Sequence, residues 1–115
     1  MLMRDIVEFH EKFDLLYGGP PRKLPAALED FRIRFMQEEL DEYKKATKLE
    51  DKLDALVDLC YVALGTAQFH GFDFMEAWSR VHAANMKKIR SASARSVFDI
   101  VKPEGWVPPD HSDLV

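Results

Sequence analysis

Residues 54–69, DALVDLCYVALGTAQF, are nearly continuously apolar after their two aspartates, and this stretch decides the fold. The run is too long for an ordinary strand and is apolar almost all round, which indicates a helix buried on most of its sides. Gly71, which follows it in HGFD, is a typical helix stop. We therefore predict a helix over residues 50–69 and, within it, a buried thiol at Cys60, the single cysteine.

Three further helices are predicted around this one. Residues 3–17 place apolar side chains on one face and end at YGGPP. Residues 25–48 begin at Pro25, a residue favoured in a first helical turn. Residues 74–90 repeat the helical spacing of apolar side chains. The sequence therefore predicts an all-α bundle of four to five helices.

Length and composition narrow the class of protein. A chain of 115 residues suits one domain, and we expect residues 1–90 to form its helical part and residues 91–115 an irregular C-terminal arm. Only SVFDIV in that arm resembles a strand. The net charge of −4 gives no reason to expect a nucleic-acid partner. Neither a signal peptide nor a membrane span is apparent, so we expect a soluble cytoplasmic protein.

Carboxylates stand beside and within the apolar side of the second predicted helix. In FMQEELDEYKKA, residues 35–46, the side chains of Glu38, Glu39 and Glu42 fit within a helical sector of about 100°. Glu39 follows Phe35 by four residues, which places it on the apolar side. The next helix repeats the pattern with Asp54 and Asp58, four residues apart on one face. A buried carboxylate tends to protonate unless a cation meets it.

Two interpretations of these acids compete. The glutamates could form a solvated face paired with lysines or with Arg34, and Asp58 could make a structural salt bridge. Alternatively, the two acidic clusters face each other across antiparallel helices and hold a divalent cation. Ligands that are all oxygens suit Mg²⁺ or Mn²⁺. The chain has no Glu-x-x-His motif of a ferritin-like di-iron bundle, no P-loop and no His-Asp dipeptide.

A family resemblance rests on these same residues. The string EELDE fits the pattern Glu-Glu-x-x-Glu, and the acid-bearing DALVDLCYVALGTA and a later NMKK follow it. From Arg4 to Arg90 the chain resembles the all-α nucleoside triphosphate pyrophosphohydrolase superfamily, which includes MazG-like enzymes, phosphoribosyl-ATP pyrophosphohydrolase and dimeric dUTPases. The tail KPEGWVPPD resembles that of small phage and bacterial MazG-like proteins, which makes phosphoribosyl-ATP the less expected substrate.

The resemblance implies a Mg²⁺-dependent enzyme that cleaves a nucleoside triphosphate between its α and β phosphates, with Mn²⁺ as a possible substitute. It implies that Glu39, Glu42 and Asp58 bind the metal and that Glu38 orients or deprotonates the attacking water. The second family motif is Glu-x-x-Asp, but Ala55 stands three residues before Asp58. Asp54, on the same face as Asp58, is the expected replacement ligand.

Candidate substrate-binding residues come from all four helices and the arm: His10, Arg34, Tyr61, Asn85, Lys88, Lys102 and Trp106. His10 is expected at the base, and Asn85 with Lys88 at a phosphate or the sugar. Lys102 and Trp106 could close over the nucleotide. The alternatives are a surface histidine, a snorkelling Lys88, a hydrogen-bonding Asn85 and an arm packed on a neighbouring subunit.

The many apolar faces predict a homodimer or a dimer of dimers, as is usual in the family. Because Ala55 departs from the family motif, a non-catalytic helical dimer that binds a nucleotide or a protein partner is the alternative function. The preferred base and sugar stay open.

Overall fold

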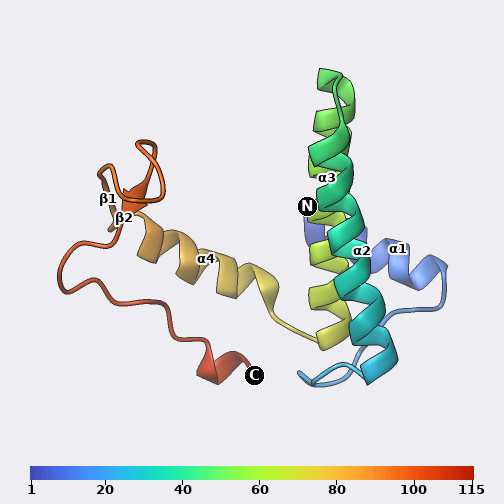
Figure 1. The fold of residues 1–115 in the computed structure, drawn as a ribbon. Helices are drawn as coiled ribbons and strands as arrows, with labels where there is room; N and C mark the ends of the chain where they lie inside the picture. Colours follow the sequence, from blue (N-terminus) through green and yellow to red (C-terminus); the bar gives the residue numbers. More distant parts are fainter. The chain divides into compact units, whose positions relative to one another are not determined.

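The computed structural model describes all 115 residues and confirms a mostly helical chain with four helices and one small sheet (Figure 1). No helix in it combines the length and the apolar character that a bilayer span requires. The chain forms two compact units, residues 1–74 with Val115 and residues 75–114, which we describe separately. The elements are α1 (Leu2–Lys12), α2 (Ala26–Lys45), α3 (Leu49–His70), α4 (Phe74–Asn85), β1 (Ile89–Arg90), β2 (Ile100–Val101) and a 3₁₀ turn, η1 (Ser112–Leu114).

Three of the predicted helices end earlier than expected, α2 at Lys45 rather than residue 48 and two others by more. α1 stops at Lys12 rather than Tyr17, because Asp14 takes a left-handed φ of 59° and the N–H of Leu15 donates to the carbonyl of His10 at 2.8 Å. α4 stops at Asn85 rather than at residue 90, because residues 89–90 form a strand instead. The predicted stop at Gly71 is confirmed, with φ of 76°.

The first unit is built on the hairpin of α2 and α3, which run antiparallel and are joined by residues 46–48 (Figure 1). α1 packs against α3. Burial on α3 concentrates in its second half, where Val62, Leu64 and Phe69 are each less than 8% exposed. The core of this unit is therefore the end of the hairpin that is remote from the connecting turn.

The other part of α3 corrects the expectation of a helix buried on most sides. Leu53, Leu56 and Val57 are 65%, 47% and 55% exposed. Cys60, predicted to be buried, is exposed as well. The reason is geometric, since α1 and α2 leave one side of α3 uncovered within a single chain.

The second unit holds the arm by polar contacts. The strands β1 and β2 pair antiparallel, with Ile89 opposite Val101, so part of the predicted SVFDIV strand is present. Arg80 of α4 forms a bidentate ion pair with Asp113, at 2.6 and 2.9 Å. The indole N–H of Trp106 donates to the carbonyl of Ala84 at 2.7 Å. These bonds hold the irregular segment after β2 to α4.

Candidate metal centre

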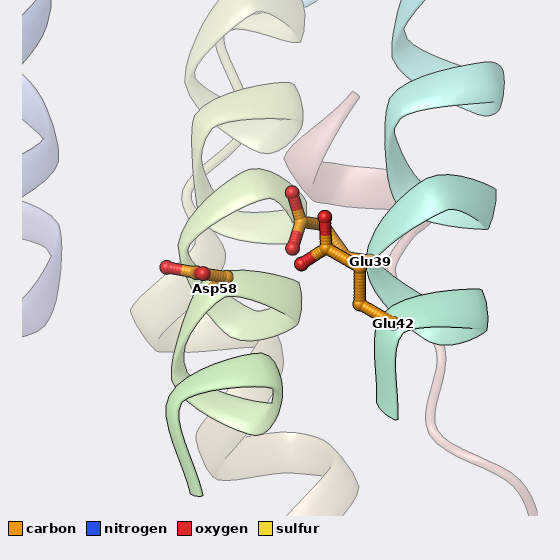
Figure 2. Close-up of side chains that lie close together, drawn as sticks. All are labelled: Glu39, Glu42 and Asp58. Atoms are coloured by element: carbon orange, nitrogen blue, oxygen red, sulfur yellow. The ribbon is translucent and has the colours of Figure 1, made fainter. Parts of the chain in front are cut away.

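Three carboxylates meet where α2 and α3 face each other. Glu39 and Glu42 extend from α2 toward α3, and Asp58 extends from α3 (Figure 2). One oxygen from each residue lies within 4.8 Å of those of the other two. The i,i+3 spacing of the glutamates puts them on one face of α2, and the antiparallel hairpin brings Asp58 opposite. We call Glu39, Glu42 and Asp58 the acid trio.

The acid trio lacks a cationic partner. Glu39 is only 8% exposed, and its buried Oε2 has no hydrogen-bond partner. Burial raises the pKa of Glu39, and the neighbouring Glu42, Asp58 and Glu38 raise it further. The pKa of Asp58 is raised by burial and then by Asp54 and Glu42. Every charged group that shifts these two pKa values is another acid, so a structural salt bridge does not account for the trio.

Two further predicted acids lie at the edge of the trio. Asp54 is exposed and lies against Asp58, whose pKa it raises. Glu38 is exposed and lines an open depression of about 300 Å³ together with Asp41, Glu42 and Lys45. Ala55, at the position of the missing family glutamate, is only 4% exposed. The structure therefore brings all five acids to one region but places only three within ligand distance of one another.

A buried polar network next to the trio escaped the sequence analysis. Arg32 of α2 is 7% exposed and donates from Nε to Thr66 Oγ1 at 3.0 Å and from Nη2 to the Val62 carbonyl at 2.8 Å. Burial lowers the pKa of this guanidinium. The available signal was its position seven residues before Glu39, which places it on the same face of α2.

The predicted ligand residues of the first unit have different environments. His10 is 3% exposed and its Nδ1 lies 2.7 Å from Gln68 Oε1, so the surface-histidine alternative is wrong. Tyr61 is 37% exposed and packs edge-on against Phe9. Arg34 is exposed and donates from Nε to the carbonyl of Asp30 at 3.4 Å.

Three predicted residues of the second unit come together. The ammonium groups of Lys88 and Lys102 lie 5.1 and 5.2 Å from the ring centroid of Trp106, within cation–π distance. Asn85 is exposed at the end of α4. Lys88 lies beyond that end, so its predicted place in a helix over residues 74–90 is wrong.

Adjacent helices thus bring three carboxylates together, with Glu39 buried, Asp58 half-buried and Glu42 exposed, and no cationic side chain joins them, an arrangement that suits a divalent metal ion. The sequence profile of the phosphoribosyl-ATP pyrophosphohydrolase family matches residues 6–85, and the chain belongs to this family. It is thus a pyrophosphohydrolase of the MazG-like superfamily, a hydrolase acting on phosphoric anhydrides. No match was found among curated proteins. The matched range contains the whole acid trio but not Lys88, Lys102 or Trp106.

Proposed function

We propose that this protein is a Mg²⁺-dependent nucleoside triphosphate pyrophosphohydrolase that cleaves between the α and β phosphates. The observation that carries the proposal is the buried, unpartnered Oε2 of Glu39 inside the acid trio. A buried oxygen without a donor, surrounded by acids, is suited to a cation. The products would be a nucleoside monophosphate and pyrophosphate.

The donor set fits Mg²⁺, with Mn²⁺ as the next choice, because all the donors are carboxylate oxygens. Glu39, Glu42 and Asp58 would hold the ion, with Asp54 as a further ligand beside Asp58. Bound there, the metal would neutralise charge on phosphate oxygens and lower the pKa of a coordinated water.

Glu38 is suited to act as the general base. It lies next to the acid trio but outside it, and it lines the open depression that solvent reaches. A carboxylate that is not committed to a metal can accept the proton of an attacking water. We therefore assign Glu38 to orient that water and take its proton.

Positive charge for the triphosphate is available on the second unit. Lys88 and Lys102 both lie over Trp106, an arrangement that offers two ammonium groups and an aromatic ring together. We propose that these lysines and Asn85 meet phosphate or sugar, and that Trp106 stacks on the nucleotide. Arg34, exposed on α2, stays a further candidate for a phosphate contact.

Product analysis tests the reaction. We expect monophosphate and pyrophosphate when the purified protein is incubated with Mg²⁺ and a panel of ribo- and deoxynucleoside triphosphates. Phosphoribosyl-ATP belongs in the panel because the family description names it. Diphosphate with free phosphate would contradict α–β cleavage. Turnover of phosphoribosyl-ATP alone would support the pyrophosphohydrolase activity but contradict a nucleoside triphosphate as the substrate. No turnover of any compound would favour the non-catalytic binding protein.

We also propose a homodimer or a dimer of dimers formed through the exposed side of α3. Leu2, Leu56, Val57, Cys60 and Tyr61 line an apolar groove of about 310 Å³ between α1 and α3. Contiguous exposed apolar surface of this kind is typical of interfaces. Light scattering should give at least twice the chain mass of 13.3 kDa. Val57→Glu, on the exposed side of α3, should reduce it to the single-chain mass, and an unchanged mass would contradict this interface.

A further inference from the structure

A small cavity of about 110 Å³ lies among α1, α2 and α3. Aromatic side chains form much of its wall, and the polar side chains of His10 and Arg32 and one glycine complete it. Its principal lining residues are Phe9, His10, Arg32, Phe35, Tyr61 and Gly65. We call this space the ring cavity.

One of the two polar side chains that line the ring cavity is His10, and its imidazole offers a hydrogen-bond acceptor. The orientation of the imidazole depends on Gln68. The amide of Gln68 is oriented by the backbone of Tyr17, because its Nε2 donates to the Tyr17 carbonyl at 2.7 Å and its Oε1 accepts the Tyr17 N–H at 3.3 Å. Oε1 also lies 2.7 Å from His10 Nδ1, so Nδ1 must carry the proton. In the neutral imidazole, Nε2 of His10 then keeps its lone pair for a ligand N–H.

The other polar side chain that lines the cavity is Arg32, a hydrogen-bond donor whose acceptors include no carboxylate. The two hydrogen bonds of Arg32, to Thr66 and to the Val62 carbonyl, use two of the five guanidinium N–H groups. Both acceptors are neutral, so the buried charge is not neutralised by them. Donors of this side chain remain for an oxygen or ring nitrogen that enters the cavity.

Because Gly65 has no side chain, the imidazole of His10 and the guanidinium of Arg32 can lie close to α3. A Cβ added at this position would lie 2.9 Å from Arg32 Nη2 and 3.4 Å from His10 Nε2. Glycine is among the poorest helix formers, yet it occupies the interior of α3 here. The close approach of the two polar side chains gives it a physical role at this position.

The ring cavity lies about one helical turn from the acid trio. Phe35 precedes Glu39 by four residues on α2, and Tyr61 follows Asp58 by three on α3. At 1.5 Å per residue these separations are about 6 and 5 Å along the helices. Because the helices are antiparallel, both steps lead away from the 46–48 turn. Phosphates held at the trio would therefore leave the base near the cavity.

We propose that the ring cavity receives the base of the substrate and selects a single-ring pyrimidine over a two-ring purine. This inference rests on the proposed function and names its substrate class. A cavity of about 150 Å³ accommodates benzene, so a space of about 110 Å³ has room for one six-membered ring at most and excludes a fused pair. A pyrimidine carbonyl or ring nitrogen accepts from Arg32, while its ring N–H or amino group donates to His10 Nε2.

Base preference is the first measurement. We expect kcat/KM for UTP, dUTP, TTP, CTP and dCTP to exceed that for ATP and GTP by tenfold or more, with Mg²⁺ present. Equal turnover of purines, or turnover of phosphoribosyl-ATP alone, would contradict pyrimidine selection by the ring cavity. Either result would leave the proposed pyrophosphohydrolase activity standing. If no nucleotide is turned over, the proposed function fails by itself. Binding of uridine and adenosine in EDTA, followed by NMR, then still decides for or against the cavity, because it needs no metal.

Two variants test the wall of the cavity. Arg32→Met removes the donors and should lower kcat/KM for pyrimidines by about 10- to 100-fold, the range for losing a charge-assisted hydrogen bond. Gly65→Ala should also lower it, although alanine favours the helix, because its Cβ displaces the Arg32 guanidinium. Arg4→Met, an exposed change on α1, is the control for charge.

Circular dichroism separates these effects from unfolding. If Arg32→Met does not fold, Gly65→Ala decides the question, since the added methyl meets the far end of a long side chain rather than backbone. Folded variants that keep the wild-type pyrimidine KM and base preference would overturn the proposal. Loss of base preference with the helical spectrum retained would support it.

Discussion

Glu39→Gln should reduce turnover by on the order of 10³-fold and leave the helix content unchanged. The substitution keeps the size of the side chain but removes the negative charge of the most buried member of the acid trio. A neutral amide is a weak ligand for Mg²⁺, so the variant loses charge stabilisation at the phosphates rather than its fold. Pyrophosphate release under saturating Mg²⁺ measures the turnover, and circular dichroism measures the helix content.

Two companion variants make this result specific. Asp58→Asn removes the charge that α3 contributes and should cause a comparable loss. Glu29→Gln makes the same chemical change in the first turn of α2, outside the acid trio, and should keep turnover within about twofold of wild type. Turnover of Glu39→Gln and Asp58→Asn within tenfold of wild type would remove the trio from the reaction.

Mg²⁺ should raise the thermal stability of the wild-type protein by about 10 °C at a concentration 100 times its Kd. Binding to the folded state alone contributes about 2.7 kcal/mol at that concentration. For a chain of this size each kcal/mol corresponds to roughly 4 °C. The physical basis is that burial, and then repulsion among the acids, raises the pKa values of Glu39 and Asp58, and a divalent cation converts that repulsion into attraction.

Glu39→Gln should change stability in the opposite sense. Without Mg²⁺ it should melt a few degrees above wild type, because the buried one of the mutually repelling charges is gone. With Mg²⁺ it should gain little. Sodium chloride at matched ionic strength is the control, because monovalent ions screen the repulsion without binding between the carboxylates. Equal gains with the two salts, or equal gains in wild type and variant, would contradict a specific metal centre.

Much of the first unit was predictable because its determinants are local. The spacing of apolar side chains predicts α2 and α3 to within a few residues, and Gly71 ends α3 by its left-handed backbone. The same spacing put Glu39 on the apolar side of α2, where the structure finds it buried. Within a helix, sequence separation fixes the face that a side chain occupies, which is why the four-residue step from Phe35 to Glu39 indicated an inward-facing acid.

Other features depended on contacts between distant segments. The early end of α4 follows from the pairing of Ile89 with Val101 across a long loop, which no local pattern reports. The exposure of Cys60 follows from how much of α3 the other helices cover. The partners of Arg32 lie 30 and 34 residues away on α3, so its burial was hidden in the sequence.

The sequence by itself thus determined the helices, their apolar faces and the inward position of Glu39, because these depend on residues a few positions apart. Only the tertiary structure decided that Asp54 lies outside the acid trio, and that His10 and Arg32 line one cavity about one turn away. The physical reason is that ligand geometry requires distances of a few ångströms between different helices. Such distances come from the packing of α1, α2 and α3 against one another, and helical periodicity fixes only the direction in which each side chain leaves its own helix.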